Sequence, residues 1–196
     1  MRKTSAPRAP DQTRNDLIAA AAKLFNSVGY FGTDSNRIAR QAGYAPGTFY
    51  LHFPDKLAIF VEVYHRWVDL EWQAIASVLT PDMPSRSESG RIAKAVLQHH
   101  RAWRIFRASL RALTVTEESV HRARVAQRER QIAQTSELLR SRGVRVTRAR
   151  VYASLLLFEI LCDAVADGDA ASLGIKERDV LAQLAADVAS LLGFRR

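Results

Sequence analysis

The stretch of residues 33–53, TDSNRIARQAGYAPGTFYLHF, constrains the fold of this chain more than any other segment. Its spacing predicts two short helices joined by a tight turn, with Ile38 and Ala42 on the inner face of the first helix. Gly43 suits the position just past the end of that helix, because glycine reaches the left-handed conformation without strain. Pro46 suits the first turn of the second helix, where its missing N–H costs nothing. The segment therefore predicts a compact helical pair.

The second helix of this pair has an inner and an outer face. Phe49 and Phe53 stand four residues apart and point inward, whereas Thr33 is the expected side-chain cap of the first helix. The outer face consists of Pro46, Gly47, Thr48, Tyr50, Leu51 and His52. These residues offer hydroxyl, imidazole and backbone groups but no carboxylate, so the outer face suits a polyanionic partner.

This segment resembles the helix-turn-helix of the tetracycline-repressor (TetR) family of bacterial transcription regulators. The family's pattern appears here as Thr33, Ile38-Ala39, Ala42-Gly43, Gly47-Thr48, Phe49-Tyr50, His52-Phe53 and Lys56. So many matches at fixed spacing make the motif specific, and the detailed resemblance covers about residues 12 to 60. Two positions depart from the family. Ala45 stands where the family often has a Ser that caps the recognition helix, and Ser35 stands where it usually has an apolar core residue.

The resemblance implies a homodimer that binds a double-stranded DNA operator through this segment. It implies phosphate contacts from Thr48, Tyr50, Lys56 and the Gly47 N–H, and base contacts from Tyr44, Pro46 and Leu51. Hydroxyl groups, an ammonium group and a helix start suit phosphate, whereas apolar side chains add shape and methyl contacts. Arg37 is expected to reach a base or a phosphate, and Arg14 a phosphate. The expected DNA-facing set is completed by Thr33, Ala45 and His52.

Composition favours an all-α protein with a nucleic-acid partner. Hydrophobic residues make up 47% of the 196 positions, and no stretch alternates in the manner of a β-strand. The net charge of +9 and the pI near 10.3 favour a polyanion. With a single cysteine, Cys162, and neither a signal-peptide pattern nor a membrane-length apolar run, we expect a soluble cytoplasmic protein without membrane contact.

Three segments are expected along the chain: a disordered basic arm at residues 1–10, a helix-turn-helix DNA-binding domain at 11–56, and a helical effector-binding and dimerisation domain at 57–196. The arm is either a DNA contact or a solvated tail. Helices outside the motif are predicted at about residues 12–28, 55–79, 114–140, 147–167 and 177–192, and two more helices are predicted to fill residues 88–113. Two capping boxes are expected, Ser85 with Glu88 and Thr114 with Glu117.

The last two predicted helices carry more apolar surface than one chain can cover. Residues 147–167 are apolar nearly all round, and residues 177–192 carry an apolar stripe. The resemblance implies that such helices associate as a four-helix bundle between two subunits. The expected dimer residues are Leu155, Leu156, Cys162, Val180, Leu184, Val188 and Leu191.

The resemblance also implies that the larger domain binds a small-molecule effector. The expected lining residues are Tyr64, Trp67, Trp103, Phe106, Arg107, Tyr152, Phe158 and Glu159. The sequence leaves open whether these side chains enclose a pocket or fill a packed core. Glu159 and Asp163 stand four residues apart and are interpreted as a rim or dimer ion pair, with contact to a ligand as the alternative.

A basic stripe is expected on one helix of this domain, opposite an apolar face. Arg104, Arg107 and Arg111 are spaced to share one side of that helix. We interpret them as a solvated basic face, and the alternative is a site for an effector with an apolar body and an anionic head, such as an acyl-CoA or fatty acid.

Other chemistries find little support in the sequence. His99, His100 and His121 lack companion ligands at metal-binding spacing, so neither a metal nor a cofactor is expected. Burial beside Asp163 predicts that Cys162 is inert. Without a phosphate-binding glycine loop or a nucleophile elbow, no enzyme activity is expected. The predicted function is a ligand-responsive transcriptional regulator, a repressor released by its effector. The alternative is an architectural or protein-interaction DNA-binding dimer without an effector.

Overall fold

The computed structural model describes residues 10–79 and 86–194, and within these residues it contains helices and no strands. In chain order the helices are α1 (Pro10–Val28), α2 (Ser35–Gln41), α3 (Pro46–Tyr50), α4 (Lys56–Ala76), α5 (Arg86–Ala102), α6 (Arg104–Thr116), α7 (Glu118–Ser141), α8 (Arg148–Asp167), α9 (Asp169–Ser172) and α10 (Glu177–Leu191). The all-α prediction is confirmed, with the short α9 as an unpredicted addition. Among the described residues, no helix is both long and apolar enough to cross a membrane. The predicted arm at residues 1–10 lies almost wholly outside this described part, which begins at its last residue.

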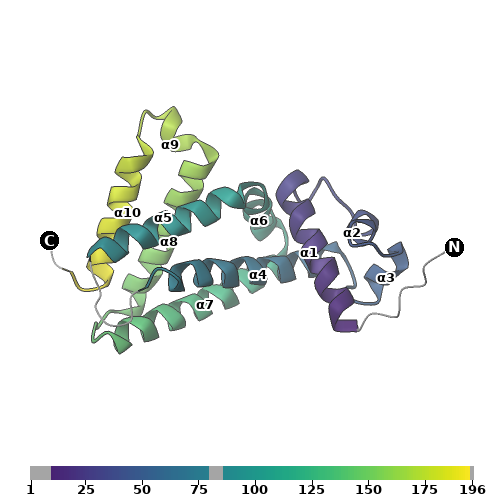
Figure 1. Cartoon of the computed structure of the whole chain (residues 1–196), viewed down its shortest axis with the longest axis horizontal. Helices are drawn as coiled ribbons and strands as arrows, with labels where there is room; N and C mark the ends of the chain where they lie inside the picture. The colour runs from purple at the N-terminus through teal and green to yellow at the C-terminus, as the bar shows by residue number, and fades with distance from the viewer. Residues whose placement is uncertain (1–9, 80–85, 195–196) are drawn as a thin grey trace.

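The molecule is elongated, with a small head at one end (Figure 1). The head contains α1, α2 and α3, and α5, α8 and α10 lie together at the other end. Between them, α4 leaves the head and runs alongside α7. Because α4 has 21 residues, it extends over roughly 30 Å and links the two ends with one rigid element.

The turn between α2 and α3 forms much as the sequence predicts. Gly43 has a φ of +83°, in the left-handed region that favours glycine, and Ala45 is the N-cap of α3 without a side-chain hydrogen bond. The start of α2 corrects the prediction. Asp34, and not Thr33, caps the helix, since its Oδ1 accepts a hydrogen bond of 2.8 Å from the Arg37 N–H. Thr33 is only 6% exposed, and its buried hydroxyl has no hydrogen-bond partner among the described residues.

The capping box predicted at Thr114 is wrong. α6 continues to Thr116, and the Thr114 hydroxyl donates to the Leu110 carbonyl oxygen at 2.6 Å within the same helix. Glu117 is then the N-cap of α7, without a side-chain hydrogen bond. The other predicted box, Ser85 with Glu88, lies outside the described residues because Ser85 does.

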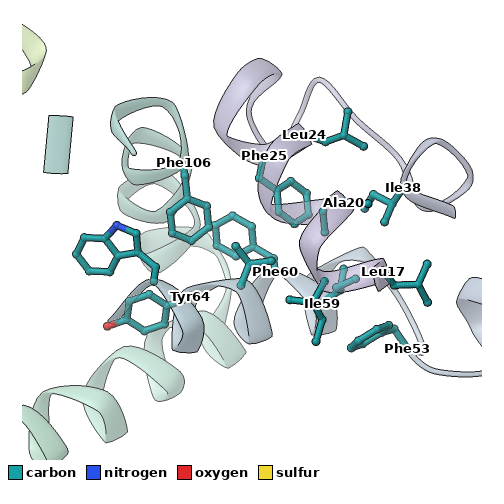
Figure 2. Packing of buried hydrophobic residues seen from close by; sticks show 14 of the residues in the cluster. Leu17, Ala20, Leu24, Phe25, Ile38, Phe53, Ile59, Phe60, Tyr64 and Phe106 are labelled. Carbon is teal, nitrogen blue, oxygen red and sulfur yellow. The ribbon is translucent and has the colours of Figure 1, made fainter. Parts of the chain in front are cut away.

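A hydrophobic cluster joins the head to the rest of the molecule. It combines buried residues of α1, α2 and α3 with others from α4 and α6. At its centre, shown in Figure 2, the Phe60 ring of α4 lies 5.1 Å from Phe25 of α1 and 4.9 Å from Phe106 of α6, measured between ring centroids. One core therefore crosses the predicted boundary between residues 56 and 57.

A second hydrophobic cluster lies among α5, α7, α8 and α10. Leu97, Val151, Cys162 and Leu184 are among its members, and each is at most 2% exposed. This cluster builds the far end of the molecule and encloses the side chains considered below as an effector site.

Candidate functional site

The outer face of α3 is open to solvent at the tip of the head. Phe49 and Phe53 support the helix from inside, at 0% and 3% exposure. On the outer side, Leu51 is 82% exposed and Tyr50 is 57% exposed, and a Cβ added to Gly47 would meet nothing within 4 Å. Ala45 is exposed beside them, whereas Pro46, Thr48 and His52 are half-buried. The face is accessible and contains no acidic residue.

Two side chains predicted to contact DNA form hydrogen bonds within the head instead. The Tyr44 hydroxyl donates to Asp16 Oδ2 at 2.7 Å, which ties the turn to α1. Lys56 Nζ donates to the carbonyl oxygens of Tyr30 and Thr33 at 2.9 and 2.8 Å, and lies 3.9 Å from the Tyr30 ring centroid. Burial lowers the pKa of Lys56. In the structure both side chains hold the motif in place, through partners more than 20 residues away in the chain.

Two arginines remain available at the edge of the head. Arg14 on α1 pairs with Glu62 at 3.0 Å and lies 5.0 Å from the Phe53 ring centroid. Arg37 is exposed and donates to the Gly32 carbonyl oxygen at 3.0 Å. An exposed ion pair contributes only about 0–1 kcal/mol, so a phosphate can replace Glu62 at small cost.

A cavity of about 120 Å³ lies among α4, α5, α7, α8 and α10. The predicted effector residues that line it are Tyr64, Trp67, Arg107, Phe158 and Glu159. Trp103 and Phe106 belong instead to the cluster that joins the head, and Tyr152 is 46% exposed on the surface. Glu71, His100 and Ser154 also line the cavity. The sequence did not single them out as cavity residues because helical spacing alone does not show which neighbouring helix each would face.

Arg107 is buried, which corrects the predicted basic stripe. Its side chain is 2% exposed, and its Nε and Nη2 donate to the two Asp163 carboxylate oxygens at 3.2 and 2.7 Å. Nη2 also donates to Glu159 Oε1 at 2.8 Å, and the guanidinium carbon lies 4.7 Å from the Trp67 ring centroid. Arg111, one turn later, is partly exposed and bridges to Asp163 at 2.9 Å. The charge of Arg107 is thus already matched inside the chain.

Glu159 of α8 forms ion pairs with arginines of both α6 and α7. Besides Arg107, its carboxylate accepts hydrogen bonds from Arg124 and Arg128 of α7. Burial alone would raise the pKa of Glu159, but the charges of these three arginines outweigh it and lower that pKa. Glu159 is therefore an ionised member of a buried cluster, not part of the rim or dimer ion pair that its spacing suggested.

His100 of α5 extends the cluster to α4. Its Nδ1 lies 2.8 Å from Asp163 Oδ1 and its Nε2 lies 3.0 Å from Glu71 Oε1. Burial disfavours the charged imidazole, but the hydrogen bonds to both carboxylates outweigh this effect and raise the pKa of His100. The same bonds overcome burial and lower the pKa values of Glu71 and Asp163. We refer to Glu71, His100, Arg107, Glu159 and Asp163, with Arg124 and Arg128, as the buried ion cluster.

The three histidines weighed as metal ligands have other surroundings. His99 Nε2 lies 2.9 Å from the Trp67 carbonyl oxygen, His100 belongs to the buried ion cluster, and His121 is exposed on α7. Within residues 10–79 and 86–194, no group of three or more His, Cys, Asp or Glu side chains is arranged to hold a metal ion.

Most of the predicted dimer residues are buried within the single chain, which corrects their assignment. Cys162, Val180, Leu184 and Val188 are at most 8% exposed, and Leu155 and Leu191 line the cavity. The apolar surface that α8 leaves uncovered consists of Tyr152, Leu156 and Ile160, at 46%, 37% and 56% exposure. Burial raises the pKa of the Cys162 thiol to about 12, with a smaller contribution from Glu71 and Asp163. The thiol is therefore protonated at neutral pH.

The fold and the exposed α3 together define a helix-turn-helix protein with a helical second domain. Residues 17–63 match the family model described as bacterial regulatory proteins, tetR family. Residues 17–63 thus carry the DNA-binding segment of this family of bacterial regulatory proteins.

Similar proteins agree with this assignment over different lengths of the chain. A 50-residue segment is 40% identical to the HTH-type transcriptional regulator LmrA of Bacillus subtilis (strain 168), covering 24% of this chain and 27% of LmrA. A putative TetR-family transcriptional regulator from Rhodococcus sp. has a TM-score of 0.75 at 17% identity, covering 93% of this chain and 99% of the other. One from Mesorhizobium loti MAFF303099 has a TM-score of 0.69 at 22% identity, covering 95% and 98%. The sequence match thus spans about a quarter of the curated relative, and the structural likeness concerns the fold.

Replacing Arg107 with Met should destabilise the protein by about 3–5 kcal/mol, because Asp163 and Glu159 would keep buried charge without this partner. The matched control is Arg111→Met, one turn later on α6. The Arg111 side chain is 39% exposed, so its loss should cost about 0–1 kcal/mol. Urea unfolding followed by circular dichroism measures both variants. Equal effects would contradict the buried pairing of Arg107.

The stability of the protein should also depend on the charge of His100. Because folding raises the pKa of His100, its contribution is fully present below the ordinary value near ~6.5 and is lost as pH rises through the folded-state pKa. The free energy of unfolding should therefore fall as the pH rises above about 6.5. His100→Gln should lose this part of the pH dependence. Denaturant titrations of the wild type and the His100→Gln variant, at a series of pH values above about 6, measure the free energy of unfolding of each. If the two free energies changed with pH in parallel, His100 would not be charged in the folded protein.

Proposed function

We propose that this chain is a ligand-responsive transcriptional regulator. It binds a pseudo-palindromic operator as a homodimer, represses transcription there, and leaves the operator when a small-molecule effector binds. The observation that carries the proposal is the outer face of α3, which is exposed, free of carboxylates and held rigidly from inside by Phe49 and Phe53. A short, firmly supported helix of this kind fits the major groove of DNA.

On this proposal, some residues of the outer face contact DNA phosphates and others contact bases. Thr48, Tyr50 and the Gly47 N–H contact phosphates, whereas the exposed Leu51 side chain contacts bases and thymine methyl groups. Arg14 and Arg37 add phosphate contacts from α1 and α2. Tyr44 and Lys56 act indirectly, because they fix the turn and the start of α4 that hold α3. The net charge of +9 favours association with a polyanion over long range.

Two heads are needed to read a pseudo-palindrome, with their reading helices about 34–36 Å apart. The uncovered side of α8 supports a two-fold interface, since Tyr152, Leu156 and Ile160 form an apolar row along it. α10 packs beside α8 and provides the second helix of a four-helix bundle between subunits.

α6 provides a route from the cavity to the head. Just before α6, at the last residue of α5, the Ala102 carbonyl oxygen accepts a hydrogen bond of 2.6 Å from Asn26 Nδ2 of α1. Further along, the Tyr30 N–H donates to Ser109 Oγ at 3.0 Å. Arg107, on the same helix, lines the cavity. A ligand that shifts Arg107 together with its ion pairs, without breaking them, therefore moves the helix on which the head rests. Nearly complete release requires about 5.5 kcal/mol of difference in binding free energy between the two states.

Tyr50→Phe should weaken binding to every DNA sequence about threefold to tenfold, because a hydrogen bond to phosphate contributes about 0.5–1.5 kcal/mol and carries no sequence information. Leu51→Ala should instead change the preference between sequences. Titration against an operator selected from random duplexes, and against its scrambled version, measures both effects. Thr116→Val, at an exposed position at the end of α6, is the control for loss of a surface hydroxyl. Wild-type binding by Tyr50→Phe to both duplexes would refute the phosphate contact and weaken the proposed function.

Leu156→Arg should convert the protein to a monomer at micromolar concentration, because a charge would enter the apolar interface between two copies of α8. Loss of the second head should then reduce operator affinity by about 10²-fold or more. Val115→Arg, at an 87% exposed apolar position at the end of α6, is the control for adding a surface charge. Sedimentation velocity reads the mass directly. A Leu156→Arg protein that sediments as the wild type would place the interface elsewhere.

A further inference from the structure

The size of the cavity limits what it can hold. Its volume is about 120 Å³, and its apolar walls include Trp72, Ile75, Val96 and Phe158. An engineered apolar cavity of about 150 Å³ in another protein binds benzene, so the present cavity suits a molecule of about one ring. A long acyl chain does not fit this volume without a rearrangement of the surrounding helices.

The charged side chains that line the cavity are already paired with one another. Glu71 bonds to His100 at 3.0 Å, and Arg107 and Arg128 both bond to Glu159. A ligand carboxylate or phosphate would either displace Glu71 or Glu159 from one of its partners or remain as an additional buried charge that lacks a partner. Such unpaired buried charge is strongly unfavourable, so the cavity disfavours anionic ligands.

Within the part of the chain that the structure describes, two uncharged polar groups on the cavity lining lack hydrogen-bond partners, unlike the charged groups. Trp67 Nε1 and Ser154 Oγ are both buried, and neither has a hydrogen-bond partner among the described residues. Trp67 is 3% exposed and Ser154 is 4% exposed. Buried polar groups are nearly always hydrogen-bonded, and an unpaired one calls for an explanation. The indole offers a donor, and the hydroxyl offers both a donor and an acceptor.

We propose that the cavity binds a neutral, single-ring molecule with one hydroxyl or carbonyl oxygen. Only the release of DNA by this molecule rests on the proposed function. The ring occupies the apolar volume beside Trp72 and Phe158. The uncharged oxygen accepts a hydrogen bond from Trp67 Nε1 or forms a hydrogen bond with the Ser154 hydroxyl, which can donate or accept. The Trp67 indole or the Ser154 hydroxyl thereby gains the partner that it lacks within the described chain. The buried ion cluster stays intact, which is why a neutral ligand is preferred over an anionic one.

Calorimetric titration of the full-length protein with three probes at pH 7 tests this ligand class. Phenol carries the neutral oxygen, toluene has the same shape without a hydrogen-bonding group, and benzoate adds a negative charge. Phenol should bind about threefold to tenfold more tightly than toluene, as expected for one additional hydrogen bond. Benzoate should bind more weakly than either. Toluene binding as tightly as phenol, or benzoate binding most tightly, would overturn the proposal.

Ser154→Ala isolates the role of the hydroxyl. The variant should remain folded, since it removes an unpaired buried group, and the ratio of phenol to toluene affinity should fall towards one. Ser141→Ala, at an exposed position at the end of α7, should keep the wild-type ratio. An unchanged ratio in a folded Ser154→Ala protein would remove Ser154 from the site.

A separate measurement distinguishes the ligand class from the proposed function. Release of labelled operator by phenol is followed at fixed salt, alongside the calorimetry. Phenol that binds with the expected preferences but leaves DNA binding unchanged would uphold the ligand class and refute its role as an effector. A protein that binds phenol but no operator at all would refute the proposed function alone.

Discussion

The bidentate pairing of Arg107 with Asp163 is the interaction on which the arrangement of the larger domain depends. A buried guanidinium is tolerated only with good geometry and a full set of acceptors, so α6 and α8 must meet at one register. Glu159 and His100 bring α7 and α5 to the same point, and Glu71 brings α4. Apolar side chains alone would allow these helices to slide, because hydrophobic packing is far less directional than these hydrogen bonds.

The position of this cluster connects it with the proposed function. α4 and α6 contribute to the cavity and also to the core of the head, where Phe60 packs against both Phe25 and Phe106. Among the described residues, the core of the head is continuous with buried side chains of α4 and α6. On the proposed function, a change in how the cluster packs would reach the head through these two helices.

Local chemistry explains which parts of the DNA-binding motif were predictable. Gly43 must adopt a positive φ, and the spacing of Phe49 and Phe53 sets the inner face of α3, so both follow from nearest neighbours in the chain. The cap of α2 was assigned one residue too early, because Thr33 and Asp34 are both good caps and only burial distinguishes them. Tyr44 was expected outside, and its partner Asp16 is invisible to local spacing.

The sequence by itself determined the all-helical fold, the motif at residues 33–53 and its family, because these rest on periodicity and spacing within single helices. Only the tertiary structure decided where the charges of the larger domain lie. Arg107 appeared to belong to a solvated stripe, since charged residues are ordinarily exposed. Its partner Asp163 is 56 residues away, and no local pattern shows that α8 will bring a carboxylate to it. For the same reason, the sequence predicted Cys162 and Leu184 as interface residues, whereas the structure packs α5 against α8 and α10 and buries both side chains within the chain.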